Sequence, residues 1–237
     1  YRMLETIRQY AQEKLWAAGE GEGLHERHLA YFVDLAERAE PNLRSFDMVK
    51  WLDRLETEIE NIRVALAWSL ESNVEAQLRL ASALLSFWHI RGHKQEGIDW
   101  LAQGLSIDQT ERGDQPILPR RAMIRGKALN AIAVLEAELL IGNPVERLEE
   151  SRVLFEALGP AGKHGLAYAL FRLADWSSDA DRKKVMLEES LALLHEVGDK
   201  FGIAECLMVL ASSARDQGHY EQVRAIDKEH LALRKEI

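Results

Sequence analysis

One helical phrase repeats in the C-terminal third of the chain, and this repetition constrains the fold more than any other feature. LEESRVLFEALG begins at Leu148, and LEESLALLHEVG begins at Leu187, 39 residues later. Between the two copies, GLAYALFRLA from Gly165 aligns with GIAECLMVLA from Gly202. Two alternating helical units at a fixed period are typical of a solenoid, because a single helix pair cannot bury both of its apolar faces. We therefore expect an all-α fold, a right-handed superhelix of stacked helical pairs.

The composition agrees with this fold and argues against several functions. The chain has 237 residues, of which 47% are hydrophobic, enough to build a continuous core. A formal net charge of −9 argues against a nucleic-acid surface, since binding to a polyanion depends on clustered Lys and Arg. No apolar run approaches the roughly 20 residues that a bilayer span needs. The single cysteine, Cys206, is typical of a small core residue in a reducing compartment, so we expect a cytoplasmic protein.

The N-terminal part of the chain shows apolar residues at helical spacing. The pattern predicts a helix over 4–17 that ends at the glycine-rich stretch Gly19–Gly23, a candidate hinge. A second helix over 24–40 is expected to stop before Pro41, because proline disfavours α conformation in the residue before it. Asp47 then caps one long predicted helix of about six turns, whose apolar stripe is Leu52, Leu55, Ile59, Ile62, Leu66 and Leu70.

The segment 113–119 is the clearest interruption in the chain. It contains turn-forming residues and two prolines, which predict a loop. This loop is expected to separate 21–112, an N-terminal helical group with the first repeat pair, from the C-terminal repeats, 120–237. Before the loop we expect helices over 74–91 and 95–106. After it, helices are predicted over 120–141, 145–158, 163–177, 181–197, 201–217 and 220–237.

The C-terminal repeats resemble a divergent tetratricopeptide array. Their period is a few residues above the 34 of that repeat. The segment LMVLA from Leu207 contains a large residue, a leucine and a small residue, and Gly218-His-Tyr220 follows it as a Gly-x-Tyr turn. These residues fall at the intervals of the tetratricopeptide motif. Val223 and Arg147 stand where that motif has a small alanine.

Three phrases in the N-terminal half carry a more specific resemblance. YRMLETIRQYAQEKL from Tyr1 resembles the helix that closes the winged-helix module of bacterial STAND-class signal-transduction ATPases, which include transcriptional regulators of the AfsR and LuxR-related type. WLDRLETEIENIRVALAWSLE from Trp51 and FWHIRGHKQEGIDWLAQGL from Phe87 resemble the opening of the helical-repeat sensor region in the same proteins. The resemblance implies that 1–20 close a winged-helix module. It also implies that the repeats receive an inducer or partner that releases an autoinhibited state.

No phosphate-binding loop of the form G-x-x-x-x-G-K-[ST] occurs in the sequence. The resemblance therefore assigns ATP and magnesium binding to an upstream module, and we expect no cofactor in this chain. No nucleophile elbow, zinc-protease helix or Cys-x-x-Cys pair is present, so no catalytic residue is predicted. His25 with His28, and His89 with His93, have helical spacing, but neither pair has a convincing third metal ligand.

In tetratricopeptide-like arrays the first helix of each pair lines the concave surface, so the outward positions of these helices are candidate binding residues. Aromatic faces beside Asp and Arg suit a peptide segment or a small polar ligand. Packing against the adjoining helix is the alternative role for each. The candidates are Ser86, His89, Glu136, Tyr168, Phe171, Asp175, Met208, Ser212 and Arg215.

These features favour binding over catalysis. The leading hypothesis is a non-catalytic sensor domain of a STAND-type transcriptional regulator, which binds a protein or small-molecule effector and acts on other modules of the same polypeptide. The alternative is a passive helical-repeat scaffold for protein assembly. An enzyme is the third hypothesis, and it requires a deep polar pocket with converging titratable groups.

Overall fold

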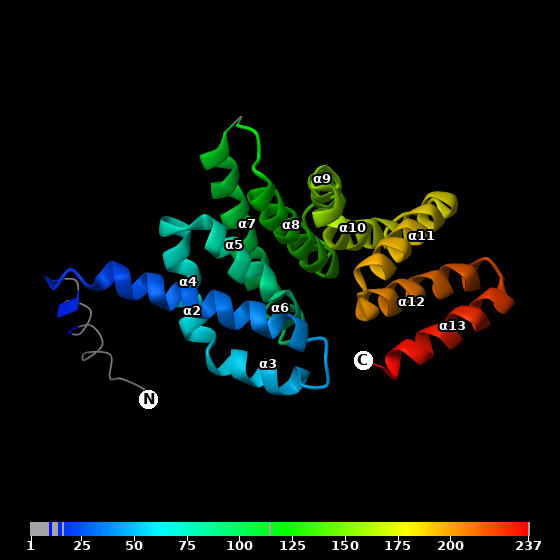
Figure 1. Cartoon of the computed structure of the whole chain (residues 1–237), viewed down its shortest axis with the longest axis horizontal. Helices are drawn as coiled ribbons and strands as arrows, with labels where there is room; N and C mark the ends of the chain where they lie inside the picture. The colour runs from blue at the N-terminus through cyan, green and yellow to red at the C-terminus, as the bar shows by residue number, and fades with distance from the viewer. Residues whose placement is uncertain (1–9, 11–13, 16, 114, 237) are drawn as a thin grey trace.

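The computed structural model describes residues 10, 14, 15, 17–113 and 115–236, which form twelve α-helices and one short 3-10 helix. This described part contains no β-strand. Successive helices pack side by side into an elongated, curved solenoid (Figure 1), so the predicted all-α solenoid is confirmed. The N-terminal group comprises α2 (Gly21–Asn42), α3 (Met48–Thr57), α4 (Ile59–Ser72), α5 (Val74–Ala83), α6 (Leu85–Ile90) and α7 (Lys94–Arg112). The C-terminal group comprises α8 (Pro119–Leu139), α9 (Pro144–Ala157), η1 (Gly159–Gly162), α10 (Lys163–Asp175), α11 (Ala180–Val197), α12 (Lys200–Asp216) and α13 (Tyr220–Arg234).

The beginning of the chain departs from the predicted helix ends. The helix predicted over 4–17 lies largely outside the described residues. Gly19 has φ +71° and belongs to a turn, whereas α2 begins at Gly21, so the glycine-rich stretch is partly helical. The prediction that the next helix stops before Pro41 is wrong, because Pro41 occupies the last turn of α2. That turn is held by the buried Ala39, whose carbonyl oxygen accepts a 2.8 Å hydrogen bond from the backbone N–H of Leu43.

The long helix predicted after Asp47 is two helices, and that prediction was also wrong. Glu58 separates α3 from α4 with φ −98° and ψ 4°, and its N–H donates to the carbonyl oxygens of both Arg54 and Leu55. The Asp47 side chain makes no cap hydrogen bond. The apolar stripe is nevertheless buried from Leu52 to Leu66, because the break lets both helices turn their apolar faces toward the same core.

A second break divides the helix predicted over 74–91. Leu84 lies between α5 and α6, and the indole N–H of the fully buried Trp88 donates across the break to the carbonyl oxygen of Ala81 at 3.1 Å. The helix predicted over 95–106 is longer, since α7 continues to Arg112. The loop predicted over 113–119 ends one residue earlier, because Pro119 begins α8, and the six C-terminal helices match their predicted bounds within three residues.

The C-terminal helix pairs are related by a regular step. Leu148 and Leu187, the first residues of the repeated phrase, are both fully buried. The ring of Phe155 packs against Gly165, and the side chain of Leu194 packs against Gly202. A Cβ atom added at Gly165 would lie 2.2 Å from the Phe155 ring, and one added at Gly202 would lie 2.6 Å from Leu194 Cδ2. The repeated glycines therefore permit the same close helix contact twice.

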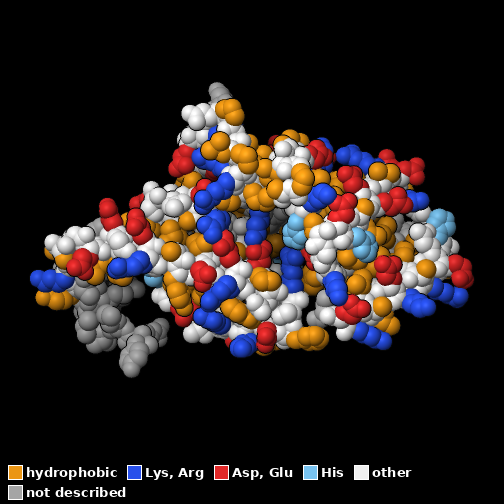
Figure 2. All heavy atoms as spheres, in the orientation of Figure 1, with side chains coloured by type: hydrophobic (Ala, Val, Ile, Leu, Met, Phe, Trp, Pro, Cys, Tyr) orange, Lys and Arg blue, Asp and Glu red, His pale blue; other side chains and the backbone are white. Residues whose placement is uncertain are grey.

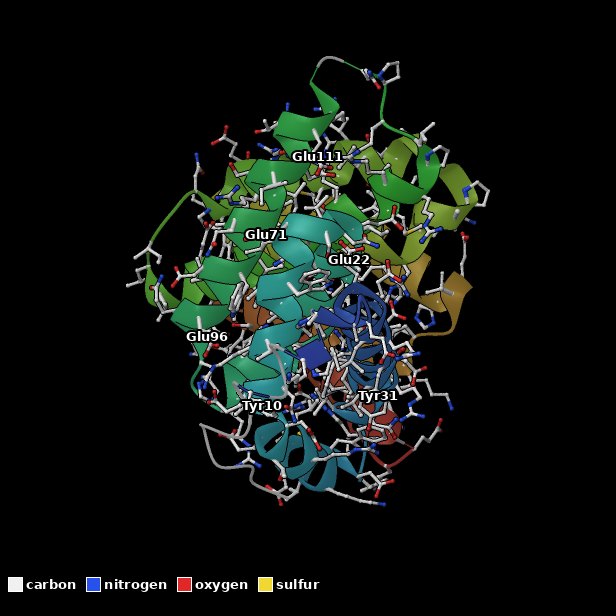
Figure 3. The ribbon with its side chains drawn as sticks, turned by 90° about the vertical axis from the view of Figure 1, so that its left-hand side faces the viewer. Tyr10, Glu22, Tyr31, Glu71, Glu96 and Glu111 are labelled. Carbon is white, nitrogen blue, oxygen red and sulfur yellow. The ribbon has the colours of Figure 1, made fainter. Side chains whose placement is uncertain are left out.

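Two large clusters of buried side chains and a small third one between α12 and α13 form the core, and α8 contributes to both large clusters, through Leu135 to the first and Ala133 to the second. Figure 3 views the N-terminal end of the solenoid, where labelled glutamates lie on α2, α4 and α7. Glu22, Glu71 and Glu111 are exposed there. Within the described part of the chain, no helix has the length and apolar character needed to cross a membrane.

The contact between Phe155 and Gly165 gives a test with a matched control. We expect Gly165→Ala to lower the free energy of unfolding by about 1–3 kcal/mol, because the new methyl group would overlap the buried Phe155 ring. Gly23 is also the third residue of its helix, but it has no neighbouring atom within 4 Å, so Gly23→Ala should stabilise by up to about 1 kcal/mol. Urea denaturation measures both changes. Shifts of the same sign in the two variants would contradict the proposed packing.

Candidate functional site

The inner side of the curve contains a groove between the two helical groups. It consists of two adjoining cavities of about 450 and 520 Å³, where the α2–α3 loop meets α6, α8, α10 and α12. Figure 2 shows Lys, Arg and His side chains around the recess between the two groups. We call this surface the groove. The residues that line both of its cavities are Arg44, Leu85, Val134, Tyr168, Arg172 and Phe201.

Local structure places the polar residues of the groove. The backbone N–H of Arg44 donates to the carbonyl oxygen of Pro41 at 3.2 Å, so the turn after α2 fixes the start of the loop. Tyr168 and Arg172 are four residues apart on α10 and therefore lie one turn apart on one face. Asp199 precedes α12 and caps it, since its carboxylate accepts a 2.9 Å hydrogen bond from the backbone N–H of Gly202.

A chain of hydrogen bonds crosses the groove. Arg44 Nη1 donates to the hydroxyl oxygen of Tyr168 at 2.7 Å, and that hydroxyl donates to Asp199 Oδ2 at 3.0 Å. His164 Nε2 lies 2.9 Å from the same carboxylate oxygen. Burial raises the pKa of Tyr168, and the Asp199 carboxylate raises it further against the opposing charge of Arg44. The phenol therefore stays protonated at neutral pH and can donate this hydrogen bond.

An aromatic side chain and two apolar residues form the rest of the shared wall. The ring of Phe201 contacts two guanidinium groups, with Arg44 Cζ 5.3 Å and Arg234 Cζ 5.4 Å from the ring centroid. Cations at such distances from an aromatic face are attracted by its negative potential. Leu85 and Val134 complete the wall. The groove thus offers an apolar surface bordered by positive charge.

Arg172 forms no ion pair with an acidic residue of the described part of the chain, and part of its guanidinium is buried. Its Nε atom is buried and makes no hydrogen bond, and its guanidinium carbon lies 4.7 Å from the centroid of the Phe171 ring. Burial lowers the pKa of Arg172, while the more distant carboxylates of Glu205 and Asp175 raise it. Burying a cation without a partner is costly, so this position is unfavourable for stability alone.

The acidic residues that line the groove already have basic partners. Glu40 pairs with Lys127 at 2.5 Å, and Glu205 pairs with Arg234 at 2.7 Å. Glu138 contacts Lys94 Nζ at 2.6 Å and His89 Nδ1 at 2.7 Å. Since Asp199 is held by His164 and Tyr168, no lining carboxylate remains for Arg172.

The structure brings three of the predicted binding residues to the groove and leaves six elsewhere. Ser86, His89 and Tyr168 line it. Two others were expected to point outward and are buried instead, with exposed fractions of 4% for Glu136 and 3% for Phe171. Glu136 is buried because Arg147 of α9 reaches it, with 3.2 Å hydrogen bonds, and Phe171 packs into the second core cluster. Asp175, Met208, Ser212 and Arg215 are exposed and do not line either cavity.

Sequence reasoning missed Arg44, Arg172, Phe201, His164 and Asp199. One signal was available for Arg172. In the aligned phrases GLAYALFRLA and GIAECLMVLA, Arg172 corresponds to Val209, which is buried. A charge at a position that the other repeat keeps apolar indicates a specific local role. No signal pointed to Arg44, because only the folded chain places its loop beside α10.

Metal binding finds no support among the residues that the structure describes, since no three His, Cys, Asp or Glu side chains gather there. His25 instead stacks on Trp68, with ring centroids 4.6 Å apart. Burial raises the pKa of the Cys206 thiol to about 11, as expected for a core cysteine.

The missing partner of Arg172 predicts an unusual stability effect. We expect Arg172→Met to leave the free energy of unfolding unchanged or to raise it by about 1 kcal/mol, because the substitution removes a buried cation without a partner. Arg125 is a matched control, since it is buried but pairs with Asp108 at 2.8 Å and Glu150 at 2.6 Å. Arg125→Met should cost about 3–5 kcal/mol. Equal losses in urea denaturation would show that Arg172 has a stabilising partner.

Asp199 predicts a pH dependence of stability. Its burial would raise its pKa, but hydrogen bonds from His164, Gly202 and Tyr168 outweigh this and lower the pKa from 3.8 to about 2. The folded state therefore gains stability that is present above pH 4 and is lost as the pH falls toward 2. Asp199→Asn keeps the helix cap but not the charge. Its stability deficit relative to wild type should shrink by about 2 kcal/mol between pH 5 and pH 2.5 in urea denaturation. A constant deficit would contradict the lowered pKa.

Comparison with known proteins finds sequence similarity to regulators of transcription. No family model matches the sequence. Over 213 residues, 87% of the chain, it is 32% identical to the "Putative HTH-type transcriptional regulator Mb0914c" of Mycobacterium bovis and to Rv0890c, described in the same words, of Mycobacterium tuberculosis. The chain spans 23% of the length of each relative.

The fold also has a relative of known structure. The crystal structure of BtubC (BKLC) from P. vanneervenii superposes with a TM-score of 0.56, covering 89% of this chain and 91% of that one. At 19% sequence identity, this likeness concerns the fold alone. The sequence similarity to the mycobacterial proteins supports a place for this chain in a family of HTH-type transcriptional regulators.

Proposed function

We propose that this chain is a non-catalytic sensor region of a transcriptional regulator, in which the groove binds an effector and thereby controls modules elsewhere in the polypeptide. The observation that carries this proposal is the similarity to HTH-type transcriptional regulators over 87% of the chain. The groove supports it further, because cavities of about 450 and 520 Å³ suit a small ligand. The lining residues come from both helical groups, so an effector would contact both.

The finer proposal is that the regulator is of the STAND class, with tetratricopeptide-like sensor repeats. It rests on the resemblance of the phrases from Tyr1, Trp51 and Phe87 to such proteins. ATP and magnesium would then bind an upstream module, DNA would be bound outside this chain, and the protein would act in the cytoplasm. Effector binding transmits a signal only if its affinity differs between the resting and active arrangements. The hydrogen bond between Arg44 and Tyr168 joins the two helical groups at the groove, where a ligand can favour one arrangement.

A passive scaffold is the second proposal, and a surface of the repeats outside the groove favours it. The second helices of the C-terminal pairs expose large apolar side chains: Val153 on α9 is 55% exposed, Val185 on α11 is 61% exposed, and Leu231 on α13 is 58% exposed. Exposed apolar side chains of this kind can contribute to protein interfaces. The two proposals therefore place binding on different surfaces.

A transcript comparison in cells that produce the full-length regulator separates the two proposals. Phe201→Ser removes the aromatic wall of the groove and should change the set of regulated transcripts, because effector binding would be weakened. Val185→Ser alters only the outer surface and should leave transcripts as in wild type. If transcripts respond to Val185→Ser and not to Phe201→Ser, the scaffold is favoured and the sensor proposal is wrong.

A further inference from the structure

Arg172 carries a charge that the fold itself does not use. The equivalent position of the next repeat is Val209, so the repeat architecture accepts an apolar residue there. The side chain is half-buried, its buried Nε makes no hydrogen bond, and no carboxylate among the described residues forms an ion pair with it. An arginine in such a position is explained if a ligand supplies the missing anion, since buried charges in proteins are normally paired.

Arg44 adds a second positive charge without an acidic partner in the described part of the chain. Its guanidinium donates to the neutral phenol of Tyr168 and lies over the rings of Tyr168 and Phe201, at 5.1 and 5.3 Å from their centroids. Both arginines line both cavities. Glu138, Glu40 and Glu205 pair with Lys94, Lys127 and Arg234, and Asp199 lies on the far side of the Tyr168 phenol, so neither arginine contacts a carboxylate of the described residues directly, although the whole chain has a formal net charge of −9.

The apolar wall beside these charges limits the class of ligand. Leu85, Val134 and Phe201 offer a surface that a free inorganic anion would leave uncovered. A ligand that fits has one anionic group and an apolar body, at a size that suits cavities of about 450 and 520 Å³. Planar guanidinium groups pair well with carboxylates through two parallel hydrogen bonds.

We propose that the groove binds a small organic acid, whose anionic group pairs with Arg172 and Arg44 and whose apolar body lies against Leu85, Val134 and Phe201. This inference names the effector class of the sensor region proposed above, and its regulatory meaning rests on that function. The binding itself rests on the unpaired charges and on the shape of the groove. The unpaired charges and the shape of the groove are both explained by a small molecule, without a peptide or a nucleic acid.

Two fluorescent probes that differ mainly in charge test the proposal directly. The anion 8-anilinonaphthalene-1-sulfonate should bind the native protein more tightly than its uncharged analogue N-phenyl-1-naphthylamine, because only the anion can pair with Arg172. Arg172→Met should weaken binding of the anion by about tenfold or more and leave binding of the neutral probe nearly unchanged. Arg172→Lys should restore part of the loss, since it retains the charge without the planar geometry. Arg44→Met should give a smaller loss.

Controls keep the binding result separate from folding and from the proposed function. Thermal unfolding followed by circular dichroism checks that each variant is folded, and Arg63→Met removes an arginine that pairs with Glu96 outside the groove.

The proposal is overturned if neither probe binds, if both bind equally in wild type, or if Arg172→Met leaves anion binding intact. It is also overturned if inorganic phosphate displaces the anion at equal concentration, because the apolar wall would then contribute nothing. If anion binding fails in Arg172→Met but transcripts stay as in wild type, the ligand class stands and the sensor function does not.

Discussion

The close approach of helices at glycine is the contact on which the curved shape depends. Phe155 of α9 packs between α8 and α10, where an added Cβ at Gly126 or Gly165 would lie 2.8 or 2.2 Å from its ring. Because glycine has no Cβ atom, the Phe155 ring can touch the helix backbone directly, and the neighbouring helix pairs lie close together. Leu194 and Gly202 repeat the arrangement one step later. Because each pair is offset from the last in the same sense, the array curves and leaves an inner surface free.

Curvature alone does not make a binding site, and the N-terminal group supplies the second wall. The loop after α2 brings Arg44 to Tyr168, which is 124 residues away in the sequence. From there the hydrogen bonds continue to Asp199 and His164, so the middle of the groove is tied to the first turn of α12. This chain of hydrogen bonds therefore joins three places in the sequence: the loop after α2, α10 and the start of α12. A shift of either helical group would alter all of its lining.

Charges in this protein are organised in two ways. Most buried or half-buried charges are paired, as Arg125 is with Asp108 and Glu150, and such pairs join successive helices of the solenoid. Arg172 is an exception, since it is held in a low-polarity environment beside Phe171 without a carboxylate contact among the described residues. Unfavourable features of this kind are expected at functional positions, where binding compensates for them.

The sequence by itself determined the solenoid and the C-terminal helix pairs, because a repeated phrase must repeat its packing, and Leu148 and Leu187 are both buried. It did not determine the breaks at Glu58 and Leu84, since both lie inside continuous apolar stripes and only the shared core decides where a helix must turn. Tyr168 was found from its outward position on a first helix of the repeat. Only the tertiary structure placed Arg44 in the groove. Arg44 and Tyr168 are 124 residues apart, and no pattern in the sequence indicates that two such distant segments come into contact.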